Sequence, residues 1–149
     1  MLDFLEFTID KFTFRVATDR FYNSEGVWAK VEGQYVRLGL SDTLQQRSGD
    51  IAFVEVKPVG TGLAFGDEVA VIETIKVDIS LSSPLSGRVI EINPTMGVAP
   101  EVINQDPYEK GWIAIIEAND WEADEPRLLA AAAYFAKMKA DIEEEVKKG

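Results

Sequence analysis

Apolar and polar residues alternate along the first third of the chain, a pattern typical of strands that bury one face. Residues 5–9 and 12–16 both alternate in this way, and the polar pair Asp10–Lys11 separates them. We therefore expect a hairpin that turns at this pair. A second hairpin is expected over residues 27–40, with Glu32–Gly33 at its turn.

The middle of the chain alternates between helix, strand and loop patterns. The segment SDTLQQRSG predicts a short helix that is capped by Ser41 or Asp42 and ended by Gly49. Further strands are expected in three apolar, β-branched runs, at residues 50–56, 88–92 and 112–118. The glycine-rich segment 60–68 is expected to be a loop, and so is segment 94–111, with one helical turn.

The apolar run at residues 69–82 is too long and too uneven for one strand. It exceeds the roughly 3–10 residues of an ordinary strand. Residues 69–72 are all apolar, whereas strict alternation begins at Ile75. This change predicts two strands joined by a bend at residues 73–76, with Lys76 at or beside its tip. The bend contains neither glycine nor proline, so we expect the pairing of the flanking strands to hold it.

A long amphipathic helix is expected at the end of the chain, over residues 124–148. Asp124 can cap it, and Pro126 is tolerated in its first turn. We expect the helix to pack its apolar face on the body of the domain, and docking of a partner on that face is the alternative. The residues that define this face recur at helical spacing: Leu128, Leu129, Ala132, Phe135, Met138, Ile142 and Val146. Many short strands followed by a closing helix indicate a mainly-β sandwich or barrel with helical additions.

The composition narrows the chemistry that such a domain can perform. The chain has 149 residues, enough for one domain, and contains neither cysteine nor histidine. Thiol catalysis, disulfides and serine–histidine–aspartate triads are therefore excluded. The net charge of −11 makes nucleic acid and anionic membranes poor partners, whereas basic protein surfaces suit it. We expect a cytoplasmic protein, because the sequence contains no spanning apolar run and no signal-like N-terminus.

Lys76 stands out because an apolar run carries it between two acids, Glu73 and Asp78. Most lysines are solvated surface groups, and this is the simplest interpretation. A nucleophilic lysine needs burial or a cationic neighbour, whereas these two acids favour the charged ammonium. Acylation at an exposed bend fits better, since it converts the ammonium into a neutral amide and requires only access. No residue of the chain itself is predicted to be catalytic.

Two other patterns of chemistry-bearing residues are rejected. The acidic segments EADE and IEEE lack the spacing of a calcium loop, and the tail acids lie on the solvent face of the predicted helix, so no metal site is expected. The segment VGTGLAFGD precedes a strand rather than a helix. It therefore lacks the helix N-terminus that holds phosphate in a nucleotide-binding loop.

A family resemblance runs from about residue 21 to the tail helix. It rests on five segments in order: RLGLSD at 37–42, GDIAFVEVKPVGTGL at 49–63, GDEVAVIETIKV at 66–77, SPLSGRVIEIN at 83–93 and NQDPYEKGW at 104–112. Together they resemble the H-protein family of the glycine cleavage system, whose members are lipoyl carriers. The resemblance implies a mainly β, flattened barrel-sandwich hybrid with a short internal helix and a C-terminal α-helix.

The resemblance also implies a role for each residue of the predicted bend. Lys76 would carry lipoic acid as a covalent amide. The lipoylating enzyme would read the residues around it, or these residues would seat the arm: Glu73, Thr74, Ile75, Val77, Asp78 and, across the hairpin, Gly87. The chain would be a non-catalytic carrier that moves an aminomethyl group between glycine decarboxylase, aminomethyltransferase and dihydrolipoyl dehydrogenase. A lipoate ligase or lipoyltransferase would attach the arm.

Two departures from the family pattern keep the cargo open. Family members commonly read His-Glu-Trp where this chain has Gly26-Val27-Trp28, and the apolar segment 2–16 is an addition. In this segment the chain is similar to H-like lipoate-binding proteins that carry sulfur intermediates for a heterodisulfide-reductase-like complex. The expected organisation is a single domain over residues 1–149, with an N-terminal extension (1–22), a barrel-sandwich core (23–119) and a C-terminal helix (124–148).

Two alternatives to a lipoyl carrier are a biotinyl carrier and an unmodified module. A biotinyl carrier usually has methionine on both sides of its lysine, whereas Ile75 and Val77 flank Lys76 here, which argues against biotin. An unmodified structural or regulatory module would keep the fold without any arm. The mass of the intact protein distinguishes this module from a lipoyl carrier.

Overall fold

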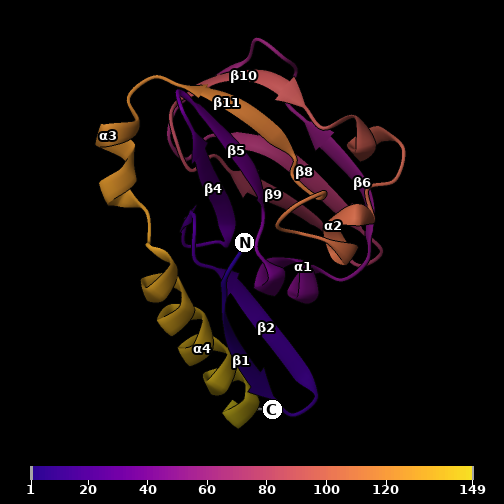
Figure 1. Ribbon diagram of the computed structural model, residues 1–149. Helices are drawn as coiled ribbons and strands as arrows, with labels where there is room; N and C mark the ends of the chain where they lie inside the picture. Colours follow the sequence, from indigo (N-terminus) through magenta and orange to yellow (C-terminus); the bar gives the residue numbers. More distant parts are fainter. Residues whose placement is uncertain (1, 149) are drawn as a thin grey trace.

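Antiparallel sheets and one long helix make up the computed structural model, which describes residues 2–148 (Figure 1). The largest sheet has six strands in the order β3 (Phe21–Tyr22), β4 (Val27–Glu32), β5 (Tyr35–Leu40), β11 (Ala114–Ala118), β10 (Gly87–Ile92) and β7 (Gly62–Leu63). A three-stranded sheet contains β6 (Ile51–Val56), β8 (Glu68–Thr74) and β9 (Asp78–Ser82). A separate two-stranded sheet contains β1 (Phe4–Ile9) and β2 (Phe12–Ala17).

The helical segments lie in the connections and at the end of the chain. They are α1 (Asp42–Ser48), the 3-10 turn η1 (Pro94–Gly97), α2 (Val102–Gln105), α3 (Trp121–Asp124), the 3-10 turn η2 (Glu125–Arg127) and α4 (Ala131–Lys148). Within residues 2–148, no helix combines the length and the apolar character that a membrane crossing requires.

The six-stranded and three-stranded sheets share one main hydrophobic core. Inward-pointing residues of both sheets are almost completely buried in it, among them Leu38, Ile72 and Val89. The sheets remain open and do not close into a barrel. The predicted fold, a mainly β, flattened barrel-sandwich hybrid with a short internal helix and a C-terminal helix, is therefore confirmed.

Both predicted N-terminal hairpins are present, and one turn differs by a residue. β1 and β2 turn at Asp10–Lys11, where Asp10 has a φ of 54° in the left-handed region. In the next hairpin Glu32 still belongs to β4 and pairs with Tyr35. The turn therefore lies at Gly33–Gln34 rather than at Glu32–Gly33.

The connections contain slightly more regular structure than the sequence predicted. Of the two candidate caps of α1, Ser41 is the one used, because its Oγ accepts a hydrogen bond from the N–H of Leu44 at 3.2 Å. Segment 94–111 contains both η1 and α2, where a single helical turn was expected. Segment 60–68 includes β7, which pairs with β10 at the edge of the largest sheet.

The C-terminal helix begins later than predicted, at Ala131 rather than near Asp124. Before it, Leu129 pairs with Tyr22 through two backbone hydrogen bonds of 2.8 and 2.9 Å. Because this pairing requires an extended backbone, the helix cannot extend through it. Asp124 is buried at the end of α3 and accepts hydrogen bonds of 2.7 and 2.8 Å from the N–H and hydroxyl of Ser86.

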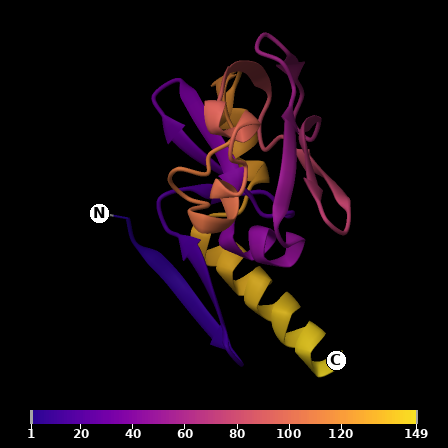
Figure 2. The same cartoon turned by 90° about the vertical axis from the view of Figure 1, so that its right-hand side faces the viewer.

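A second hydrophobic core lies between α4 and the β1–β2 hairpin, which run along the same end of the molecule (Figure 2). Phe14 and Val16 of β2 are buried in it. From α4 it receives Tyr134, Met138 and Ile142, which recur at helical spacing. The terminal helix therefore packs on the body of the protein as expected. Of the predicted apolar face, Met138 and Ile142 are buried, whereas Ala132 and Val146 are exposed, and Tyr134 takes part in the packing instead.

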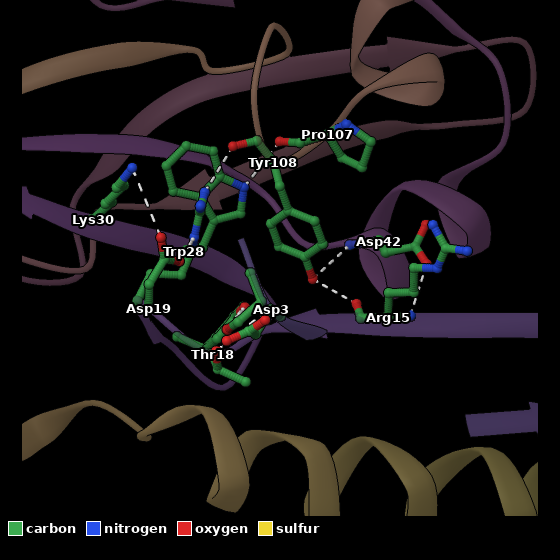
Figure 3. A network of polar contacts seen from close by, with 12 residues as sticks. Asp3, Arg15, Thr18, Asp19, Trp28, Lys30, Asp42, Pro107 and Tyr108 are labelled. Atoms are coloured by element: carbon green, nitrogen blue, oxygen red, sulfur yellow. Dashed lines mark hydrogen bonds and ion pairs between the residues drawn. The ribbon is translucent and has the colours of Figure 1, made fainter. Parts of the chain in front are cut away.

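Polar contacts attach the β1–β2 hairpin to the remaining sheets (Figure 3). The hydroxyl of Tyr108 donates a hydrogen bond to the carbonyl of Arg15 at 2.7 Å and accepts one from the N–H of Asp42 at 3.2 Å. Burial raises the pKa of Tyr108 above that of an ordinary tyrosine, so this hydroxyl stays protonated and able to donate. The buried guanidinium of Arg20 donates hydrogen bonds to Asp19 and to the carbonyl of Tyr108, both at 2.8 Å.

Candidate functional site

The long apolar run contains a bend as predicted, but the bend lies later than residues 73–76, because Glu73 and Thr74 still belong to β8. β8 ends at Thr74 and β9 begins at Asp78, so Ile75, Lys76 and Val77 form the connection, which we call the tip. Ile75 is 85% exposed and Val77 is 53% exposed, and Lys76 is exposed between them. The tip therefore presents a lysine in the middle of an accessible apolar turn.

The hydroxyl of Thr74 holds the tip in place without a glycine or proline. Its Oγ1 accepts hydrogen bonds from the N–H groups of Lys76 and Val77 at 3.2 and 3.1 Å, and donates one to the carbonyl of Val77 at 3.0 Å. The N–H of Thr74 donates to the same carbonyl at 2.9 Å. Sequence reasoning attributed the bend to strand pairing alone and missed this hydroxyl. A threonine just before a turn is the local signal that indicates it.

Two carboxylates lie directly below the tip. Glu73 and Asp78 are opposite each other in the β8–β9 pair, so their side chains share one face of the sheet. The next pair, Ile72 with Ile79, faces the main core, and Ile72 is fully buried. Glu73 and Asp78 therefore project from the opposite, outward side and place negative charge beside Lys76. Among residues 2–148, no group of three or more potential metal-ligating side chains is gathered.

Gly87 lies away from these residues. It begins β10 in the six-stranded sheet, where it pairs with Leu63 and Ala118, and is not across the β8–β9 hairpin as the resemblance suggested. It is buried, and a Cβ atom there would collide with the carbonyl oxygen of Glu117. The close approach of the neighbouring strand explains why residue 87 is a glycine. Recognition of Gly87 by a lipoylating enzyme stays a prediction.

The position of the missing family histidine is filled by other side chains. Gly26 has a φ of 99°, and a Cβ added to it would lie 2.8 Å from the hydroxyl oxygens of both Ser41 and Tyr134. Ser41 caps α1 and Tyr134 belongs to α4, so the packing of two helices leaves no room for a side chain here. A side chain as large as histidine at this position would therefore collide with the two hydroxyls that join α1 to α4.

A cavity of about 410 Å³ lies at the end of β9 that is remote from the tip. Glu25 lines it, fixed by hydrogen bonds of 3.2 and 2.9 Å from the N–H and hydroxyl of Ser82. Arg127 and Lys137 line it as well, and the guanidinium of Arg127 lies 3.7 Å from the ring centre of Phe65. The cavity therefore offers charges of both signs and an aromatic ring to a small group.

Comparison with known proteins agrees with this geometry. The sequence model of the glycine cleavage H-protein matches residues 20–141. The glycine cleavage system H protein of Anaeromyxobacter sp. (strain K) is 40% identical over 130 residues, which are 87% of this chain and 98% of that protein. That of Geobacillus thermodenitrificans is 38% identical over 115 residues, which are 77% of this chain and 90% of that protein.

A solved structure has a similar overall fold. The crystal structure of a glycine cleavage system H protein from Mycobacterium marinum superimposes with a TM-score of 0.72 at 26% sequence identity, over 80% of this chain and 96% of that one. The match of the family's sequence model covers both main sheets and the tip, and leaves the β1–β2 hairpin outside. From the shared sheets, the tip between β8 and β9 and these similarities, it follows that the chain belongs to the glycine cleavage H-protein family.

Proposed function

We propose that the protein is a lipoyl carrier in which Lys76 bears the lipoyl group as an amide. The observation that carries this proposal is the tip: one exposed lysine, in a bend fixed by Thr74 and placed above two paired carboxylates. Membership of the glycine cleavage H-protein family supports the same assignment. The chain acts as a carrier of a reacting group and not as a catalyst.

The residues of the tip fit such a group. The chain contains no cysteine, so redox-active sulfur has to come from an attached group. When bound, lipoate supplies a dithiolane disulfide that can take up and release cargo. The protein's own residues keep the attachment point at the end of a short, paired hairpin, so that the arm extends into solvent and reaches successive active sites. Tethering of this kind raises the effective concentration of the cargo at each site.

The partners follow from the proposed cargo, an aminomethyl group derived from glycine. Glycine decarboxylase loads it, an aminomethyltransferase removes it, and dihydrolipoyl dehydrogenase restores the disulfide. A lipoate ligase or lipoyltransferase attaches the arm. The net charge of −11 favours rapid, weak encounters with basic surfaces on these enzymes, and such encounters weaken as ionic strength rises.

Intact-protein mass spectrometry after co-expression with a lipoate ligase tests the attachment site. Wild type is expected to gain the mass of one lipoyl group, and Lys76→Ala is expected to gain none. Lys11→Ala is the matched control, because Lys11 is also an exposed lysine in the turn of a hairpin. A lipoyl mass that persists in Lys76→Ala contradicts the assignment.

Mass spectrometry of the protein purified from its native host tests the cargo. An adduct with the mass of an aminomethyl group, dependent on added glycine, supports the proposed pathway. The H-like carriers that the N-terminal segment resembles would instead show an added sulfur species. The relatives compared above are all glycine cleavage system H proteins, which supports the first outcome.

A further inference from the structure

The outward side of the three-stranded sheet carries a large aromatic side chain with no cover. Phe53 of β6 pairs with Glu73 of β8, which in turn pairs with Asp78 of β9. The three side chains therefore form one row across the sheet, directly below the tip. Phe53 is 67% exposed. Large apolar side chains exposed in a group typically mark an interaction site, and Ile75 and Val77 of the tip extend this group.

The next outward-pointing row along the sheet also combines a carboxylate with an apolar side chain. Glu55 pairs with Val71, and Val71 pairs with Ser80. We call the two rows together the outward face; its residues are Phe53, Glu55, Val71, Glu73, Asp78 and Ser80. Its ionisable groups, Glu55, Glu73 and Asp78, are all acidic. The face thus combines an apolar anchor with negative charge. The sheet that carries it lies at one side of the molecule in Figure 2.

We infer that the outward face is the docking surface for the enzyme that acylates Lys76, with Phe53 as its anchor. The enzyme is expected to present an apolar pocket for the ring of Phe53 and lysine or arginine side chains opposite the carboxylates. This inference rests on the proposed function and extends it from the hairpin to a third strand, β6. Phe53 and Glu55 are specificity-determining residues and take no part in the chemistry.

The chemistry of attachment explains why this partner, more than the others, must touch the outward face. Lipoate first reacts with ATP to form lipoyl-AMP, and pyrophosphate leaves. The ammonium of Lys76 loses one proton to the enzyme or to water, and the neutral Nζ attacks the carboxyl carbon of lipoyl-AMP. AMP leaves as the C–N bond forms, and loss of a second proton from Nζ gives the amide. For this step Nζ itself must enter the active site, so the enzyme surface lies against the strands immediately below the tip. Enzymes that act on the far end of the arm can work at a greater distance.

The test is the rate at which a purified lipoate–protein ligase transfers lipoate to the apo-protein in the presence of ATP. Phe53→Ala is expected to lower kcat/KM by about tenfold, mainly through KM, as for a central aromatic anchor. Phe12→Ala is the matched control, because Phe12 is a 54% exposed phenylalanine on the other hairpin, and its rate should stay at the wild-type value. Phe53→Leu should restore part of the rate.

A charge reversal tests independently whether the carboxylates of the outward face contribute to docking of the enzyme. Glu55→Lys is expected to slow transfer severalfold at low ionic strength, with the difference shrinking as salt is added. Glu91→Lys, on an exposed residue of β10, is the control. Wild-type kcat/KM for both Phe53→Ala and Glu55→Lys overturns the inference. If Lys76→Ala is still lipoylated, the proposed function itself fails, so the two failures are distinguishable.

Discussion

Two hairpins of this molecule end in an exposed lysine, and they differ in almost everything else. Lys11 lies in the two-residue turn between β1 and β2, and Lys76 lies in the tip between β8 and β9. The first turn depends on Asp10 in the left-handed region, whereas the second depends on the hydroxyl of Thr74. Exposure of a lysine in a turn is therefore too general a feature to indicate function.

The surroundings of the two lysines are what separate them. β1 and β2 form a sheet of their own, and one face of it is covered by α4. β8 is the central strand of its sheet, so both of its edges are paired, and its outward side places the half-buried Glu73 beside the tip, opposite the exposed Asp78. The first hairpin completes a hydrophobic core, while the second presents a group to solvent. This contrast predicts that substitutions can change the free energy of unfolding and the lipoylation of Lys76 separately.

The largest expected effect concerns stability at the first hairpin. Phe14 is 7% exposed and packs in the second core, so Phe14→Ala should lower the free energy of unfolding by about 3 kcal/mol, as for other deleted core aromatics. Denaturant unfolding measures this loss. Lipoylation of Lys76 should proceed at the wild-type rate under native conditions. A matching drop in the lipoylation rate would show that the two hairpins are coupled.

A smaller and local effect is expected at the tip. Thr74→Val removes the hydroxyl that bonds to both Lys76 and Val77, and should lower the free energy of unfolding by only about 1 kcal/mol. Hydrogen exchange at the amides of these two residues should become faster, and lipoylation slower. Thr13→Val is the control, since it removes a hydroxyl that bonds to Thr8 on the first hairpin. Equal exchange at the tip in both variants would contradict the role of Thr74.

The smallest effect is a dependence of stability on pH near the base of the first hairpin. Burial alone would raise the pKa of Asp19, but its hydrogen bond to Arg20 and the charges of Arg20 and Lys30 bring the pKa below the ordinary value. A lowered pKa stabilises the folded state above the unfolded value of about 3.9, and this contribution is lost as the pH falls through the folded pKa. Acidification should therefore lower the Tm of wild type more than that of Asp19→Asn.

The size of this last difference is limited by solvent. The carboxylate of Asp19 is 41% exposed, so water and salt screen its interaction with Arg20. Thermal unfolding of both proteins on either side of about pH 4 measures the difference. Identical changes in Tm for the two proteins would show that another acid dominates the acid sensitivity.

The elements that could be predicted are those whose signal is local. The change from a continuous apolar run to strict alternation predicted that β8 and β9 are two strands. The start of α4 could not be predicted, because residues before Ala131 fit a helical pattern and only the pairing of Leu129 with Tyr22 excludes it. Gly87 was misplaced for a related reason: its distance from Lys76 along the chain does not reveal which sheet β10 joins.

The sequence by itself determined the periodicity of the strands and the net charge of −11, and its lack of cysteine and histidine excludes thiol catalysis and serine–histidine–aspartate triads. It also singled out Lys76, because a lone cation between two acids interrupts an apolar run. Only the tertiary structure decided which side of β8 faces the core and that Phe53 has no cover. It also decided that Tyr134 occupies the space beside Gly26. Strand pairing and helix packing join residues far apart in the chain, so no local pattern contains this information.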